Sequence, residues 1–191
     1  MSGIGHNNGP TMEAGFAWRK HSWSKARADL LPTLPIEVLR TRVKRAKALG
    51  LPYQTYASVR ASTGRDVVGF LFSNNALRVQ LVGRYVPTER ITKLSRVQAQ
   101  LAALVHAPLE PEALRRMLAE RDLAFETAPA PHISQSWSET ARAVLAPIRA
   151  AQLPRDGVLV IGDTALEAEW SEAAKLAGFL PSERYFAPLE R

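Results

Sequence analysis

Asp163 and Thr164 have the clearest arrangement for chemistry in this sequence, at the end of an apolar run and the start of a helix. The run GVLVIGD (157–163) has the composition of a buried strand. In open α/β sheets ligands bind at the carboxyl ends of strands, where an aspartate can hold a divalent cation. Thr164 would cap the helix or contact a phosphate at its positive N-terminus. We interpret Asp163 first as a structural acid at the start of this helix. In that role it would pair with a nearby arginine. The alternative is a nuclease or phosphoesterase centred on Asp163 that uses Mg²⁺ or Mn²⁺.

Ser73, Asn74 and Asn75 form a second polar group, directly after the apolar run DVVGFLF (66–72). If that run is a strand parallel to 157–163, its end lies at the same edge of the sheet as Asp163. The three side chains would then bind a phosphate or a sugar. Serine and asparagine also cap helices and form turns, so a structural role is the alternative.

Basic residues concentrate in the segment 18–65, which holds 11 of the 25 lysines and arginines of the chain and only two acids. This excess predicts an anionic partner, which would be DNA or RNA or, as an alternative, an acidic protein. Five of the basic residues would neutralise phosphates: Arg40, Arg42, Lys44, Arg45 and Lys47. Three other residues would stack on bases or contact them: Tyr53, Tyr56 and Arg60. A solvated face whose aliphatic stems cover the core is the other interpretation.

Two helices are predicted to present these residues. Residues 36–50 repeat apolar side chains at helical spacing, and Gly50 and Pro52 end the helix. The second helix is expected over 53–62. The tight turn between them also fits a helix-turn-helix, whose second helix would present Gln54, Thr55, Ser58 and Arg60 to base edges. The apolar stripe of the first helix, which is Ile36, Leu39, Val43 and Ala46, is expected to pack against a partner.

Beyond residue 65 strands and helices alternate. We expect strands at 66–72, 78–86, 123–127 and 157–163, and helices at 88–105, 111–121, 136–151 and 164–177. Because such alternation builds parallel crossovers, the predicted class is α/β: a basic N-terminal helical module, then a small, largely parallel sheet of about 3–5 strands covered by helices. The expected parts are a flexible tail (1–17), the helical module (18–65) and the α/β domain (66–191). The last two could share one core.

Composition narrows the class of protein. The 191 residues include no cysteine, which excludes disulfides and thiol catalysis. No run approaches the ~20 apolar residues of a membrane span, so we expect a cytoplasmic protein without a membrane partner. The four histidines have no metal-binding spacing. Glu167, Glu169 and Glu172 are interpreted as a solvated acidic face or, as the alternative, as a surface that docks against the basic module of the same or another chain. Trp137 and Trp170 are interpreted as core residues, with a base-stacking platform as the alternative.

Residues 66–186 resemble the PIN/NYN group of metal-dependent ribonucleases. The shared motif is Gly162-Asp163-Thr164 before a helix, and the predicted order of strands and helices is similar to that fold. The resemblance implies an α/β nuclease domain in which Asp163 binds the metal. It also implies that Glu139 stands for a second acid in the middle of the domain.

The chain departs from that group at the first strand. Members carry an aspartate at the end of this strand, where the present chain has Phe72 and then the polar residues 73–75. Asp66 lies at the opposite end of the strand. The start GIGHNNGP is similar to that of a bacterial family of unknown function, and this similarity implies no activity.

The function expected from the sequence is that of a non-enzymatic nucleic-acid-binding protein with a regulatory role and no cofactor. Its basic helical surface carries this expectation. The alternatives are the metal-dependent enzyme at Asp163 and a non-catalytic protein–protein adaptor whose basic module docks on an acidic protein.

Overall fold

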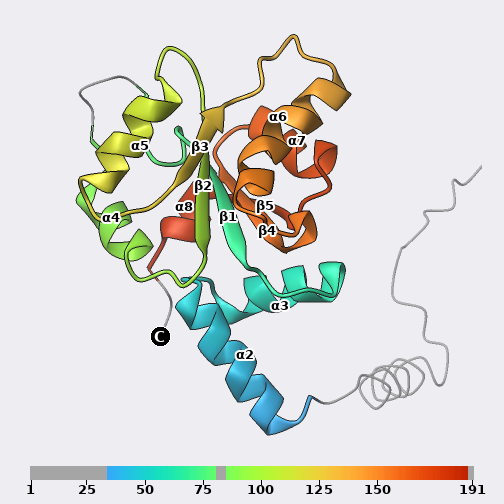
Figure 1. The fold of residues 1–191 in the computed structure, drawn as a ribbon. Coiled ribbons are helices and arrows are strands. Elements are labelled where there is room, and N and C mark those ends of the chain that lie inside the picture. The colour runs from blue at the N-terminus through green and yellow to red at the C-terminus, as the bar shows by residue number, and fades with distance from the viewer. Residues whose placement is uncertain (1–33, 81–84, 189–191) are drawn as a thin grey trace, which may run out of the picture. The chain divides into compact units, whose positions relative to one another are not determined.

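The computed structural model describes residues 34–80 and 85–188, which Figure 1 shows as a ribbon. The chain divides into two compact units, Met1–Leu39 and Arg40–Arg191. The predicted tail (1–17) and the first part of the basic segment (18–33) lie outside the described residues. The second unit contains the sheet and almost all of the helices, and the sites below belong to it.

The described residues form a five-stranded sheet and the helices around it. The helices are α2 (Ile36–Ala48), α3 (Tyr53–Thr63), α4 (Thr88–Leu94), α5 (Pro111–Ala119), α6 (Trp137–Ala150), α7 (Ala165–Ala173) and α8 (Ser182–Phe186), with a 3₁₀ turn at Arg155–Gly157. The strands are β1 (Gly69–Ser73), β2 (Gln100–Val105), β3 (Glu126–Pro129), β4 (Val158–Gly162) and β5 (Gly178–Pro181). Every strand pair is parallel, so the predicted α/β class is confirmed. None of the described helices has the length and apolar character to cross a membrane.

The strand order β3-β2-β1-β4-β5 defines where a ligand site is expected. The chain runs outward from β1 through β2 to β3, and α6 then carries it back to β4 on the other side of β1. In such doubly wound sheets the crevice for ligands forms outside the carboxyl ends of the strands at the point of reversal. That point lies between β1 and β4, whose ends carry Ser73 and Asp163.

Helices cover both faces of the sheet, and the side chains of β1 alternate between two apolar cores. Phe70 and Phe72 belong to the core that also contains Ala46 of α2 and Tyr56 of α3. Leu71 belongs to the core formed with α6 and α7. The second half of α2 and α3 therefore pack in one core with the sheet.

Two predicted elements are wrong. The helix expected over 88–105 ends at Leu94 as α4, and QLAALV forms β2 beside β1. Alanine and leucine favour helices, but a strand buried on both faces of a parallel sheet needs only apolar side chains. The strand expected at 78–86 is absent from the described residues of that range. β5 and α8 were not predicted, because four and five residues are too few to display a period.

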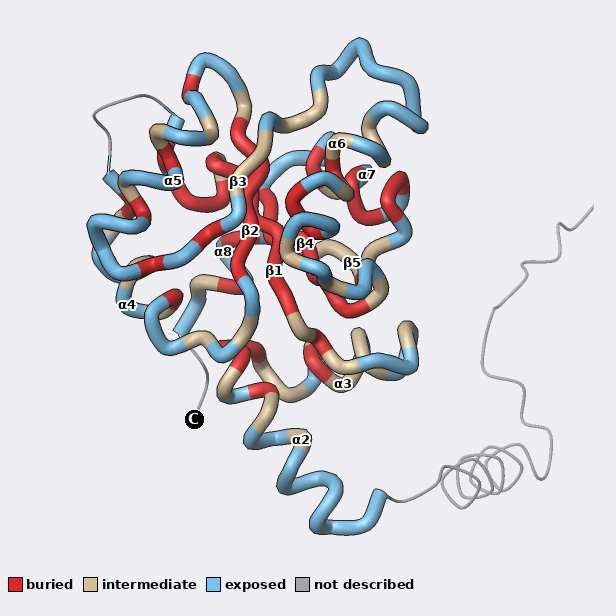
Figure 2. Tube along the Cα trace, viewed as in Figure 1, coloured by how far each residue is buried: buried red, intermediate tan, exposed pale blue. Residues whose placement is uncertain are grey.

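The apolar stripe of α2 is exposed over most of its length. Ala46 is buried, whereas Ile36, Leu39 and Val43 are 62%, 37% and 45% exposed. Figure 2 shows the same contrast, with exposed residues along most of α2 and buried residues along the central strands β1, β2 and β4. The expectation that the stripe packs against a partner stays a prediction for these three residues.

Candidate functional site

Asp66 holds the two basic helices against the start of β1. Its Oδ2 accepts a hydrogen bond from Arg45 Nε at 2.9 Å, and its Oδ1 accepts one from the Tyr56 hydroxyl at 2.8 Å. Arg60 Nη1 lies 3.9 Å from the same Oδ1. Burial and, next, the bond to Asp66 raise the pKa of Tyr56. Three of the eight residues predicted to contact nucleic acid are thus engaged in holding α2 and α3 in place.

The same arginine places the end of α2 at the amino edge of the sheet. Arg45 Nη2 donates to the carbonyl of Val67 at 2.8 Å, and its Nη1 donates to the carbonyl of Gln98 at 3.0 Å. These carbonyls precede β1 and β2. Asp163 follows β4 at the carboxyl edge, and β1 spans about 13 Å between the two edges at about 3.3 Å per residue. The basic helices and the polar cluster around Asp163 therefore lie at opposite edges of the sheet.

Asp66→Ala is expected to lower the free energy of unfolding by about 1–2 kcal/mol, because Arg45 and the Tyr56 hydroxyl lose a shared acceptor. The Asp66 side chain is one-third exposed, so water compensates for part of the loss. Urea unfolding would measure the change. Asp156→Ala is the matched control, since Asp156 pairs with the exposed Arg65, and it should cost less than about 0.5 kcal/mol. Equal effects of the two substitutions would contradict the assigned role of Asp66.

Three other basic residues form one exposed surface on α2, named here the basic face: Arg40, Lys44 and Lys47. Steps of four and three residues keep their side chains within about 60° of each other around the helix. Arg42 is half-buried and points to another side of the helix, and Tyr53 is also half-buried. Tyr56 is buried, so it is not available to stack on a base.

At the carboxyl edge of the sheet, Asp163 is bound by two other side chains of the protein. Its Oδ2 lies 3.3 Å from Arg78 Nη1, and its Oδ1 accepts a hydrogen bond from the Ser182 hydroxyl. Its side chain is 19% exposed. The ion pair expected of a structural acid is thus present. Across residues 34–80 and 85–188 no group of three or more His, Asp or Glu side chains is placed to hold a metal ion. The metal-dependent enzyme stays a prediction.

Ser73 and Asn74 close the turn after β1. Ser73 Oγ accepts a hydrogen bond from the backbone of Ala76 at 3.0 Å. Asn74 Oδ1 accepts from the backbone of His106 at 2.9 Å, and its Nδ2 donates to the carbonyl of Val79 at 2.8 Å. Both side chains are buried. These bonds match the turn-forming alternative for the two residues and fix the end of β2 against the end of β1.

Glu167, on α7, is the centre of the polar network at this edge. Its Oε2 accepts hydrogen bonds from the backbone of Asp163 at 2.6 Å and of Thr164 at 3.1 Å. Its Oε1 accepts from Asn75 Nδ2 at 2.8 Å and lies 3.2 Å from His106 Nε2. Burial by itself raises the pKa of this fully buried carboxyl, but the hydrogen bonds, that of His106 first, outweigh burial and lower the pKa to about 2. Glu167 is therefore a buried carboxylate that gathers donors from three loops.

The interpretation of Glu167 as part of a solvated acidic face is wrong, although Glu169 and Glu172 are exposed. A local signal could have revealed it: Thr164 and Glu167 have the spacing of a capping box, and Thr164 Oγ1 accepts from the backbone of Glu167 at 3.2 Å. Gly162 makes room for the carboxylate, because a Cβ there would lie 2.8 Å from Glu167 Oε2.

Glu139 stands at the start of α6 and closes a capping box with Ser136, whose backbone donates to Glu139 Oε2 at 2.9 Å. The Ser136 hydroxyl and then its backbone lower the pKa of this exposed carboxyl. No contact with Asp163 occurs within the described residues. Sequence reasoning also missed His106, Arg78 and Ser182, which come from separate loops at the carboxyl edge and carry no local motif.

Comparisons of this chain with protein-family models, with curated proteins and with solved structures found no match. The resemblance of residues 66–186 to PIN/NYN nucleases therefore stays a prediction.

Proposed function

We propose that this protein binds nucleic acid through the basic face of α2. The observation that carries the proposal is the exposure of Arg40, Lys44 and Lys47 on one side of a helix. The neighbouring Arg45 anchors that helix to the backbone before β1 and β2. Cations on a folded helix lose less conformational entropy on binding than cations on a flexible tail would.

Contacts to phosphates, and not to base edges, are the expected mode of binding. Tyr56 is buried, and Arg60 lies beside Asp66, so two residues suited to base contacts are engaged elsewhere. Phosphate contacts release counterions and carry little sequence information. The formal charge of +7 adds a long-range attraction that speeds the encounter. We therefore expect salt-sensitive binding with weak sequence preference.

The test is charge reversal of the basic face, in the variant Arg40→Glu/Lys44→Glu/Lys47→Glu. Its affinity for a short DNA duplex and for single-stranded RNA at low salt is expected to fall at least tenfold. The slope of log affinity against log salt should decrease by about 2–3, because about one counterion is released per phosphate contact. Fluorescence anisotropy over a salt series measures both quantities and shows which nucleic acid binds more tightly.

The matched control reverses three exposed cations elsewhere, in the variant Arg142→Glu/Arg149→Glu/Lys175→Glu. Both variants change the net charge equally, so a local surface predicts a loss with the first variant only. Equal losses would assign the binding to net charge, and no binding by the wild type at low salt would end the proposal. Retention of a co-purified protein after nuclease treatment would support the adaptor alternative instead.

A further inference from the structure

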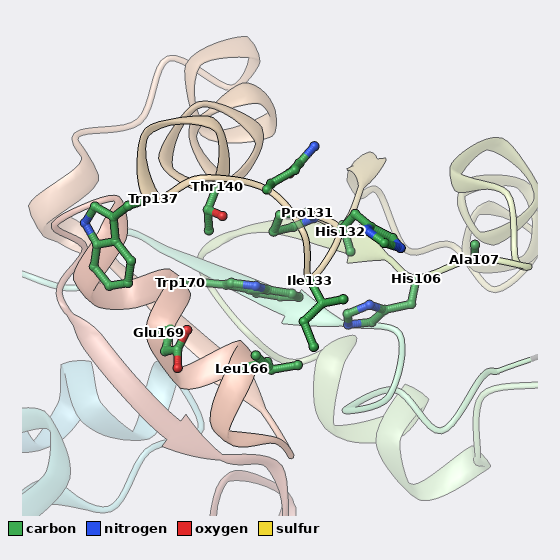
Figure 3. A pocket seen from close by; sticks show the side chains of 12 residues that line it. His106, Ala107, Pro131, His132, Ile133, Trp137, Thr140, Leu166, Glu169 and Trp170 are labelled. Carbon is green, nitrogen blue, oxygen red and sulfur yellow. The ribbon is translucent and has the colours of Figure 1, made fainter.

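A pocket of about 420 Å³ lies beside the carboxyl ends of β2 and β3. Its walls come from the loops that follow these two strands and from α6 and α7, as Figure 3 shows. Its volume lies within the range of about 300–1,000 Å³ that small-molecule sites occupy. The basic face plays no part in it, since α2 reaches the sheet at the opposite edge.

Large apolar side chains, most of them exposed, surround the pocket. Trp137, Ile133 and Leu166 are 54%, 74% and 45% exposed, and all three line the pocket. Trp170 forms the inner wall and is 3% exposed (Figure 3). Several exposed apolar side chains around one hollow are typical of a binding site. The expectation that both tryptophans are core residues is therefore wrong for Trp137.

His106 supplies an oriented polar group in the wall. Its Nε2 lies 3.2 Å from Glu167 Oε1, and its ring centroid lies 5.5 Å from that of Trp170. The Glu167 carboxylate is ionised and can only accept, so the hydrogen between the two groups is on Nε2. The other nitrogen, Nδ1, is then an acceptor in the neutral ring. Within the described residues no donor is bonded to Nδ1.

The charge of the lining indicates which ligands fit. Glu169 is the sole Asp, Glu, Lys or Arg among the lining residues, and its side chain is exposed at the pocket. A carboxylate there repels anions and attracts neutral donors or cations. Thr140 and Gln135 add hydroxyl and amide groups that both donate and accept. Flat apolar walls, an acceptor on His106 and one carboxylate together suit a planar ring that carries N–H donors.

We propose that this pocket binds a small, uncharged or cationic heteroaromatic amine of the size of an aminopurine, with its N–H group donating to Nδ1 of His106. Trp137 and Leu166 cover the ring, and Trp170 closes the inner end. Glu167 acts as a positioning residue, because it fixes the tautomer of His106 without lining the pocket itself.

The test uses two probes: 9-methyladenine, and the same base with both hydrogens of its amino group replaced by methyl groups, which removes the N–H donors and adds bulk. The His106→Gln variant below separates the lost hydrogen bond from the added bulk. Titration of the ¹⁵N-labelled protein by NMR measures binding through the indole N–H signal of Trp137, assigned with Trp137→Phe. The wild type is expected to bind 9-methyladenine about tenfold more tightly than the dimethylated base, which is the effect of one lost hydrogen bond at a half-buried acceptor.

Two variants test the contribution of the His106 acceptor and that of the apolar walls separately. His106→Gln keeps an amide donor for Glu167 and removes Nδ1, so it should bind both probes equally and unfold at an unchanged temperature. Trp137→Ala, followed through the indole N–H signal of Trp170 in the same pocket, should weaken both probes at least tenfold. Tyr85→Ala, at an exposed ring outside the pocket, should weaken neither. No binding of 9-methyladenine by the wild type, or equal affinity for the two probes, would overturn the proposal. These outcomes do not depend on nucleic-acid binding at the basic face.

Discussion

Glu167→Ala is expected to lower the free energy of unfolding by about 3–4 kcal/mol, which is a large part of the stability of a small domain. The carboxylate oxygen Oε2 accepts hydrogen bonds from the backbone N–H groups of Asp163 and Thr164, with N–O distances of 2.6 and 3.1 Å. It also accepts from Asn75, and it faces His106. Alanine would remove the buried acceptor that these part-buried donors share, and polar groups left without a partner are costly.

Urea unfolding followed by circular dichroism measures this loss, provided that the slope of free energy against urea stays unchanged. Glu169→Ala is the matched control, because Glu169 lies on the same helix and is exposed. It should change stability by less than about 0.5 kcal/mol. A cost below about 1 kcal/mol for Glu167→Ala would show that the network is not a centre of stability.

Acid is expected to remove the same stabilisation. The pKa of Glu167 is lowered from 4.5 to about 2 in the folded protein, so folding favours its ionised form. A carboxyl with a depressed pKa stabilises the fold fully above about pH 4.5 and progressively less as the pH falls through the window down to about pH 2. A difference of 2–3 pKa units corresponds to about 3 kcal/mol.

The measurement compares the wild type with Glu167→Gln between about pH 6 and pH 2. The stability difference between them should shrink by about 3 kcal/mol on acidification, because glutamine does not titrate. Glu112→Gln serves as the control. The pKa of Glu112 is also lowered to about 2, by bonds to Arg115 and then Arg116, but these groups are exposed to solvent. Parallel curves for wild type and Glu167→Gln would be the contradicting result.

The two proposed sites are separable because the sheet lies between them. Arg45 places α2 at the amino edge, while Glu167 and His106 lie at the carboxyl edge. A substitution of Glu167 that leaves the protein folded should therefore disturb the pocket and not the salt dependence of nucleic-acid binding. Charge reversal on the basic face should do the opposite.

Much of the fold could be predicted from local patterns. GVLVIGD and DVVGFLF are apolar runs with turn residues at their ends, and they form β4 and most of β1. Capping residues such as Ser136 and Thr164 mark the starts of α6 and α7. Local patterns failed for QLAALV, whose alanines and leucines favour a helix. Its place between β1 and β3 makes it a strand, and that place is a tertiary property.

In the candidate sites the difference between what the sequence determines and what the tertiary structure decides is larger. The sequence by itself determined the α/β class, the concentration of positive charge before residue 65, and the presence of polar side chains after two central strands. Only the tertiary structure decided which of these groups are engaged: Arg45 and Tyr56 bind Asp66, and Asp163 binds Arg78. It also placed Glu167 beside His106, 61 residues away. The physical reason is that periodicity and capping act within a few residues, whereas burial and hydrogen bonding between loops depend on which strands become neighbours.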